Sequence, residues 1–167
     1  RDVIFNSDAT IGNISGSFIG NEFMSGSSYT LAGGVIRNSS ANITNLSADF
    51  IGNHIQKGNG ADQIFGGLIN NEGTAEIDKI SGNFLYNEVI AGDVSYLFGG
   101  LIYNGSYGGN PSPIGEISGN FEHNTVKGSA YLVYGGLIAN YYGKALGNIS
   151  GDYLNNTVSA EGGSYAV

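Results

Sequence analysis

Residues Ile114–Val126 read Ile-Gly-Glu-Ile-Ser-Gly-Asn-Phe-Glu-His-Asn-Thr-Val, and this stretch decides the fold because it recurs along the chain. The shared pattern is Ile-x-x-Ile-Ser-Gly-x-Phe-x-x-Asn-x-Val. Four further copies keep the same internal length: Ile11–Phe23, Ile43–Ile55, Ile77–Val89 and Leu146–Val158. Self-similarity at a fixed period of about 20–50 residues is typical of solenoids and other repeat architectures.

A second block, Gly-Gly-Leu-Ile-x-Asn, alternates with the first. It occurs at Gly33–Asn38, Gly66–Asn71, Gly99–Asn104 and Gly135–Asn140, and the opening residues 1–6 align with it. Cutting before each second block divides the chain into repeats 1–32, 33–65, 66–98, 99–134 and 135–167. Their lengths differ only in the links between blocks, as expected of stacked coils joined by surface turns. We therefore predict a single domain of five repeats of about 33 residues.

The period inside the repeat is that of β-strands. Apolar or small residues alternate at a spacing of two in Ile117, Gly119 and Phe121. The runs Val94–Phe98 and Tyr131–Tyr134 are rich in the β-branched and aromatic residues that strands prefer. Gly and Asn disfavour helix interiors, and no segment shows an apolar period of 3.6. The sequence predicts an all-β parallel solenoid, and we favour one wide coil per repeat over two narrow coils.

Coils stacked about 4.8 Å apart would align equivalent residues into columns. One predicted column is an aromatic stack inside the core: Phe18, Phe50, Phe84, Phe121 and Tyr153. An aliphatic column lies beside it: Ile14, Leu46, Ile80, Ile117 and Ile149. A third column contains only Gly or Ala at positions 16, 48, 82, 119 and 151, which indicates a bend or a ring lying against backbone.

Two columns of asparagine are predicted to form amide ladders, in which each side chain donates to the next coil. The first ladder contains Asn21, Asn53, Asn87, Asn124 and Asn156. The second contains Asn6, Asn38, Asn71, Asn104 and Asn140. Because Asn tolerates left-handed backbone, we also expect the first ladder to supply the sharp turn of each coil. The simplest interpretation of all these columns is that they hold the fold.

The signatures Gly66-Gly67-Leu68-Ile69 and Phe84-Leu85-Tyr86-Asn87, with their counterparts in other repeats, resemble the repeat of bacterial polymorphic outer-membrane proteins. More broadly they resemble the passenger domains of autotransporter adhesins. The resemblance spans the whole chain, but the third residue is Leu or Val where the family usually has Ala, and the period is long. It implies a right-handed parallel β-helix that is exported to the cell surface and used for adhesion or as a stalk.

Composition excludes several classes of partner. The net charge is -8, with six Lys plus Arg, so phosphates of nucleic acid would not be neutralised. No apolar run approaches the roughly 18 residues of a membrane span. The chain has no Cys, which removes disulfides and thiol chemistry. We expect no cofactor, no metal and no enzymatic activity, and an extracellular or cell-surface location.

Parallel β-helices also host polysaccharide-cleaving enzymes, and such sites need several carboxylates on one face. Glu22, His54 and Glu88 follow the ladder Asn in adjacent repeats, about 5 Å apart along the stack. They could poise a His between two carboxylates or bind a divalent ion. The alternative is a solvated face in which His54 separates two like charges. Asp49 and Asp152 share another column with Ser and Asn, which indicates exposed polar strand positions.

Tyrosines gather near the most variable link: Tyr103, Tyr107, Tyr141 and Tyr142. Their rings could stack on sugars or on a neighbouring fibre, or they could cover turn backbone.

Both ends of the sequence fall at the same point of the repeat, without a capping segment. We expect either a section of a longer array or a unit that stacks head to tail with itself. The sequence thus favours a structural stalk, adhesin or fibre module, with glycans or a host surface as possible partners. The alternative is a carbohydrate-binding or polysaccharide-cleaving β-helix.

Overall fold

A computed structural model describes residues 2–26, 30–60, 63–105, 113–142, 145–161 and 165–166. The described residues form strands and turns without any helix, so none of them forms a helix that could cross a membrane. The all-β prediction is confirmed.

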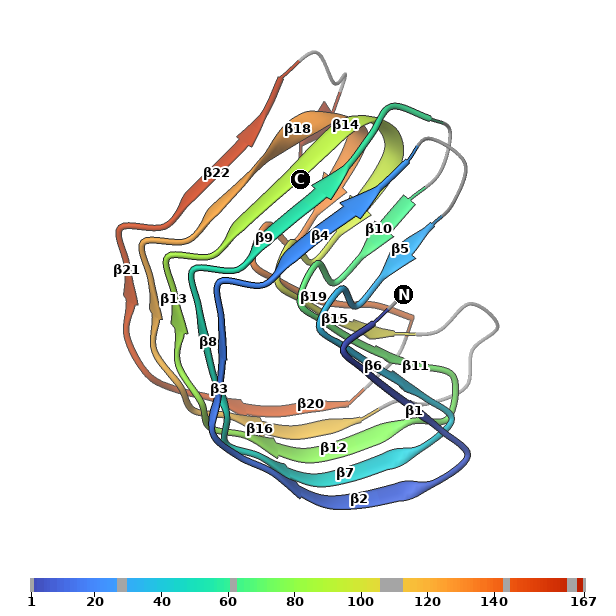
Figure 1. Cartoon of the computed structure of the whole chain (residues 1–167), viewed down its shortest axis with the longest axis vertical. Coiled ribbons are helices and arrows are strands. Elements are labelled where there is room, and N and C mark those ends of the chain that lie inside the picture. The colour runs from blue at the N-terminus through green and yellow to red at the C-terminus, as the bar shows by residue number, and fades with distance from the viewer. Residues whose placement is uncertain are drawn as a thin grey trace.

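The chain winds as a right-handed parallel β-solenoid. In Figure 1 each coil runs clockwise, while successive coils lie farther from the viewer, from blue to red. The first coil contains five strands: β1 (Ile4–Ser7), β2 (Thr10–Ile14), β3 (Ser17–Ile19), β4 (Glu22–Ser25) and β5 (Leu31–Ala32). The strand pair β4 and β5 forms an arm, because the chain runs outward along β4 and returns along β5 (Figure 1).

Sheet 1 gives the register of the coils. It contains β1, β6 (Ile36–Ser39), β11 (Ile69–Glu72), β15 (Ile102–Gly105) and β19 (Ile138–Asn140). Ile4 pairs with Ile36, which pairs with Ile69, then Ile102, then Ile138, at intervals of 32, 33, 33 and 36 residues. One repeat therefore makes one wide coil, and five strand levels are joined by about four full turns.

Two further sheets are also five strands deep. Sheet 2 contains β2, β7 (Asn42–Leu46), β12 (Glu76–Ile80), β16 (Ile114–Ile117) and β20 (Leu146–Ile149). Sheet 3 contains β3, β8 (Asp49–Ile51), β13 (Phe84–Leu85), β17 (Phe121–Glu122) and β21 (Tyr153–Leu154). Every pairing in both sheets is parallel and joins equivalent repeat positions.

Sheet 4 forms the arm. It contains β4, β5, β9 (His54–Lys57), β10 (Gln63–Phe65), β14 (Glu88–Phe98), β18 (Thr125–Tyr134), β22 (Thr157–Ala160) and β23 (Tyr165–Ala166). In the third and fourth coils one long strand, β14 or β18, covers both sides of the arm and bends at its tip (Figure 1). The register between them shifts at Ala91/Val94, which lets the strand curve.

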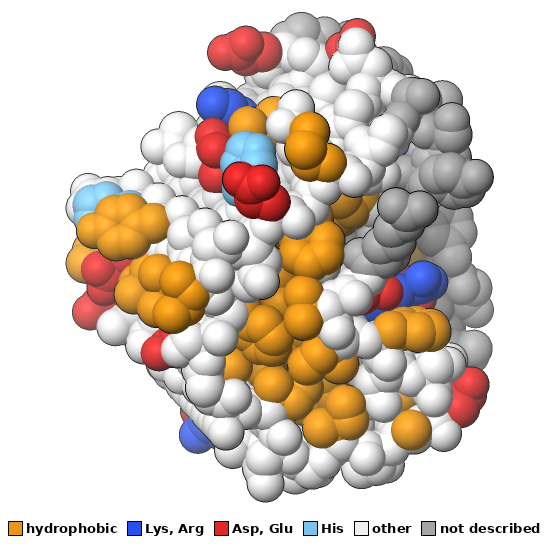
Figure 2. Space-filling model, viewed as in Figure 1, with side chains coloured by type: hydrophobic (Ala, Val, Ile, Leu, Met, Phe, Trp, Pro, Cys, Tyr) orange, Lys and Arg blue, Asp and Glu red, His pale blue; other side chains and the backbone are white. Residues whose placement is uncertain are grey.

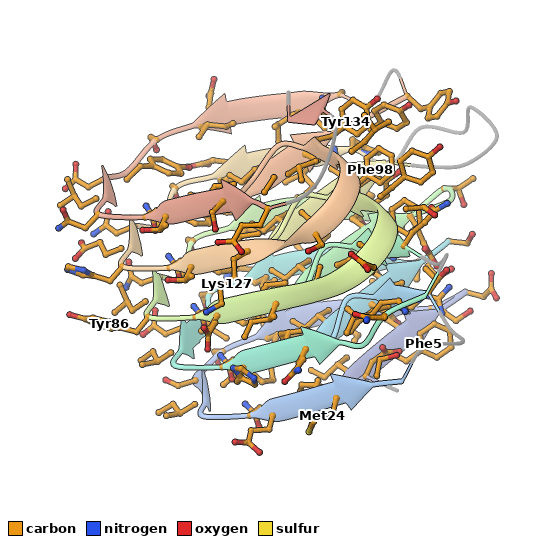
Figure 3. The ribbon with its side chains drawn as sticks, turned by 90° about the horizontal axis from the view of Figure 1, so that it is seen from above. Phe5, Met24, Tyr86, Phe98, Lys127 and Tyr134 are labelled. Atoms are coloured by element: carbon orange, nitrogen blue, oxygen red, sulfur yellow. The ribbon has the colours of Figure 1, made fainter. Side chains whose placement is uncertain are left out.

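The core lies inside the coils and follows the alternation of each strand. Ile77 and Ile80 on β12 and Phe84 on β13 are fully buried. The same positions are buried in the coils on either side, so apolar side chains pack both within a coil and between coils. Figure 3 shows these layers one above another, in a view across the stack.

The glycine pair that opens each second block has a steric origin. Gly66 has a φ of 60°, and a Cβ there would overlap the carbonyl oxygen of Ile69. A Cβ on Gly67 would come within 2.7 Å of the Val89 side chain. The first glycine is therefore needed for a left-handed turn, and the second allows the Val column to pack against backbone.

The small-residue column excludes side chains because of neighbouring backbone. A Cβ on Gly82 would overlap the carbonyl oxygen of Ala48 in the preceding coil, and one on Gly119 would overlap that of Gly82. The close approach is therefore between coils and involves main chain, in place of the aromatic ring considered from the sequence.

Candidate functional site

The first asparagine ladder is present through all five coils. Asn21 Nδ2 donates to Asn53 Oδ1 at 2.8 Å, and the same bond joins each later pair at 2.9 Å. The backbone N–H of each donor residue reaches the same oxygen at 3.0 Å. The remaining Nδ2 hydrogen of Asn87 donates to the carbonyl oxygen of Phe50 at 2.8 Å. Asn53, Asn87 and Asn124 are almost completely buried, so these bonds satisfy polar groups in the interior.

The sharp turn beside this ladder is made by the preceding residue, which corrects the expectation that the ladder Asn adopts left-handed backbone. Positive φ values fall at Gly20, Gly52, Tyr86, His123 and Asn155. The ladder asparagines themselves are not among the residues of positive φ, and their amides bond along the stack.

The second ladder is also confirmed. Its side chains are Asn6, Asn38, Asn71, Asn104 and Asn140, joined by Nδ2 to Oδ1 hydrogen bonds of 2.8–3.0 Å. Asn38 Nδ2 also donates to the carbonyl oxygen of Ala41 at 2.9 Å. This ladder therefore closes the corner between sheets 1 and 2.

A third ladder exists in the column that the sequence indicated as merely exposed and polar. Asn83 donates to Asp49 Oδ1 through both its backbone N–H, at 2.8 Å, and its Nδ2, at 3.1 Å. Asn120 N–H donates to Asn83 Oδ1 at 3.1 Å, and Asp152 N–H donates to Asn120 Oδ1 at 3.0 Å. These bonds point toward the first coil, opposite to the other two ladders.

The aromatic stack runs through the core as predicted. Ring centroids of successive members are 5.1, 4.7, 4.4 and 4.8 Å apart from Phe18 to Tyr153. The three central rings are fully buried, whereas Tyr153 is 39% exposed. Its remaining burial raises the pKa of the Tyr153 phenol, because the charged form is less well solvated there.

The column Glu22, His54 and Glu88 is in register on β4, β9 and β14. His54 Nδ1 lies 2.9 Å from Glu88 Oε2, and Lys127 Nζ lies 3.2 Å from Glu88 Oε1. The structure records no hydrogen bond or ion pair between Glu22 and His54, both of which it describes. Figure 2 shows these charged groups together on the outer surface of the arm. Glu88 thus bridges a His and a Lys, a cation that the sequence reasoning did not include.

This column is a solvated surface cluster. The side chains of His54 and Glu88 are 32% and 36% exposed. Within the described ranges, no group of three or more His, Cys, Asp or Glu is arranged to hold a metal ion. The cluster can accept and donate hydrogen bonds to a ligand that lies across the surface.

The tyrosines near the variable link do not form one edge. Tyr103 is 2% exposed and packs in a second aromatic cluster, 4.9 Å from Phe65 and 5.9 Å from Phe98. Tyr141 belongs to the rim of that cluster, whereas Tyr142 is 53% exposed. Tyr107 lies outside the described residues. Tyr103 therefore contributes packing between the arm and sheet 1, which differs from the exposed position expected for it.

The two end faces expose side chains that the middle coils bury. On the fifth coil Ile149 and Val158 are 48% and 47% exposed, while their fourth-coil counterparts Ile117 and Val126 are at most 1% exposed. On the first coil a cavity of about 660 Å³ opens between β4 and β5, lined by Phe23 and other residues. Figure 2 looks onto this first-coil face and shows hydrophobic side chains across its centre.

No protein-family model, curated protein or solved structure matches this chain. The parallel β-solenoid implied by the outer-membrane-protein resemblance is present, and the family relationship itself has no support from these comparisons.

Proposed function

We propose that this chain is a structural repeat module of an exported surface stalk, adhesin or fibre, and that its role is to stack coil on coil. The observation that carries the proposal is the match between the two end faces. The asparagine, aromatic and aliphatic columns that end on the fifth coil at Asn156, Tyr153 and Ile149 begin on the first coil at Asn21, Phe18 and Ile14, which are residues of the same chemical kind.

The ladders support this match in chemical terms. Asn156 occupies the donor position of a column in which Nδ2 points to the next coil, and Asn21 occupies the acceptor position at the other end. In the third ladder Asp152 presents a carboxylate where a further coil would bring the N–H and hydroxyl of a residue like Ser17.

The apolar columns support it as well. A further coil would place a ring on Tyr153 and cover Val158 and Ile149, as the fifth coil covers the fourth. Burial of this surface is favourable, and in solenoids stability is approximately a sum of such nearest-neighbour terms. The covering coil comes from the same polypeptide or from a second copy.

The surface location rests on composition and on the resemblance of the repeats. The chain has low charge content, no Cys and a net charge of -8, which suit an exported protein that does not bind nucleic acid.

A direct head-to-tail fusion of two copies tests the proposal. In such a fusion the repeat 1–32 of the second copy would follow the repeat 135–167 of the first copy without a change of repeat register. We expect the thermal midpoint of the fusion to exceed that of the single chain, since two exposed faces become one junction. The matched control carries Val158→Asp in the first copy only and loses the gain. Equal midpoints for single chain, fusion and control would contradict the proposal. Electron microscopy of the single chain then tells self-stacking, seen as filaments, from continuation within one polypeptide.

A further inference from the structure

One corner of the solenoid carries exposed aromatic rings that the fold does not require. The corner between sheets 3 and 4 is closed by a left-handed residue in each coil: Gly20, Gly52, Tyr86, His123 and Asn155, with φ between 55° and 60°. Gly adopts this conformation without strain, and Asn and His are enriched in it, whereas a bulky residue such as Tyr is disfavoured there. Three coils show that the corner closes without a ring, so Tyr86 calls for another explanation.

The two rings form a platform on the outside of the molecule. Their centroids are 4.9 Å apart and their planes differ by 1°. Tyr86 is 61% exposed, and Figure 3 shows it projecting from the side of the solenoid. Since the rings are parallel and about one coil spacing apart, His123 covers one face of Tyr86 and the other face is turned toward the second coil.

That second face of Tyr86 looks onto an open step. The second and first coils contribute Gly52 and Gly20 at this corner, and a Cβ built on either residue would meet nothing within 4 Å. Two coils without side chains leave a step about 9–10 Å deep along the stack. A flat ring of ligand size can lie there and continue the stack that His123 and Tyr86 begin.

The step has apolar and polar borders. Ile19, 64% exposed, and Ile51 precede the two glycines on the outer face of sheet 3. Glu22 and His54 follow two residues after the glycines on sheet 4, with Glu88 paired to His54 at 2.9 Å. The ring face therefore lies between an aliphatic border and a row of hydrogen-bonding groups.

We propose that this corner binds a neutral saccharide, one pyranose ring of which stacks on Tyr86 over Gly52. The C–H face of a pyranose packs on an aromatic ring, and its hydroxyl groups would bond to His54 and to the carboxylates of Glu22 and Glu88. Lys127 lies 3.2 Å from Glu88, but Glu22 has no ion pair recorded in the described part of the chain, and this carboxylate together with the net charge of -8 disfavours sialylated, sulfated or phosphorylated ligands. This binding goes beyond the structural role proposed above and does not depend on it.

A protein partner fits the corner less well. Stable protein interfaces bury about 800 Å² on each partner, and their energetic centre is a desolvated pocket surrounded by a rim. The corner between β13 and β14, to which Tyr86 belongs, is convex (Figure 1), and the Tyr86 side chain is mostly solvated. A single sugar ring needs only one aromatic face with polar groups beside it.

The test is binding of the fluorescently labelled 167-residue chain to an array of albumin-linked oligosaccharides, with neutral, sialylated and sulfated glycans and unmodified albumin. The Tyr86→Gly variant removes the platform, and the Gly52→Asn variant fills the step with a residue that coil five already carries. Tyr142→Gly is the matched control, because Tyr142 is also an exposed tyrosine with left-handed backbone, at φ 59°.

We expect neutral glycans to bind the parent chain, with about tenfold or greater loss in both Tyr86→Gly and Gly52→Asn and no loss in Tyr142→Gly. Thermal midpoints should change little in all three, since each receives a residue that tolerates this turn. Failure of the parent chain to bind any neutral glycan would overturn the proposal, as would unaltered binding in both site variants. Binding confined to anionic glycans, or equal signal on unmodified albumin, would also overturn it, the latter in favour of a protein ligand.

Discussion

The side chain of Asn87 donates to Oδ1 of Asn124 at 2.9 Å, although the two residues are 37 positions apart in the chain. Asn87 Oδ1 in turn accepts both the backbone N–H, at 3.0 Å, and the Nδ2, at 2.9 Å, of Asn53. All three residues are buried. One carboxamide therefore ties three successive coils together.

Asn87→Ala should lower the free energy of unfolding by about 3 kcal/mol or more, because it leaves two buried donors of Asn53 without an acceptor. The measurement is urea unfolding followed by circular dichroism. Asn13→Ala, on an exposed position of β2, is the control and should change stability by less than about 0.5 kcal/mol. Similar values for the two variants would mean that the ladder contributes little.

Phe84→Ala should cost about 3–5 kcal/mol, since Phe84 is fully buried between two rings at 4.7 and 4.4 Å. The control is Phe5→Ala, because Phe5 is 58% exposed. In the described part of the chain, the one partner recorded for the Phe5 ring is the Arg37 guanidinium. Its loss should be about 1 kcal/mol or less. A comparable loss at both positions, measured by the same urea titration, would contradict the register of the stack.

Gly66→Ala should destabilise the solenoid by about 2–4 kcal/mol, because a Cβ meets the carbonyl of Ile69 at a positive φ. Gly12→Ala is the matched control, since a Cβ there meets nothing within 4 Å. We expect it to be neutral in thermal unfolding. If both glycines tolerate alanine equally, then the second block recurs for a reason other than turn sterics.

Tyr153→Phe should make the protein more resistant to alkali. Burial raises the pKa of the Tyr153 phenol above its ordinary value of 10.0, so the folded state retains a proton that the unfolded state releases. Stability contributed by the neutral phenol is complete below pH 10 and is lost as pH rises through the folded-state pKa. Thermal midpoints measured across this range should fall more steeply for the parent chain than for the variant. Parallel curves would count against this linkage.

The columns that recur as one residue type were predictable from sequence. Phe84 and Asn87 each stand at a position where the same chemistry repeats in every coil, and stacking at a fixed spacing leaves one arrangement for them. The third ladder was not predicted, because its hydrogen bonds join unlike residues such as Asp49, Asn83 and Asp152. No single residue type recurs in this column to indicate a ladder.

Two other features that the sequence did not predict, the burial of Tyr103 and of Lys57, depend on the arm of sheet 4. Alternation places Tyr103 on the outer face of sheet 1, and only the folded-back arm buries it. Lys57 is 1% exposed and donates to the Gly26 carbonyl oxygen at 3.4 Å, in a column that elsewhere contains Ser25 and Ala91. A long aliphatic stem can replace several small side chains in filling the arm, which a pattern of residue types does not reveal.

The first and second asparagine ladders also carry aligned dipoles. Each of their carboxamides turns its oxygen toward the preceding coil and its nitrogen toward the following coil, so the group dipoles align as peptide dipoles do in a helix. Hydrogen-bonded chains of this kind polarise one another. The first-coil face is therefore the negative pole of each ladder and the fifth-coil face the positive pole. A coil approaching in the reversed sense would bring like poles together, so electrostatics as well as shape distinguishes the two ends.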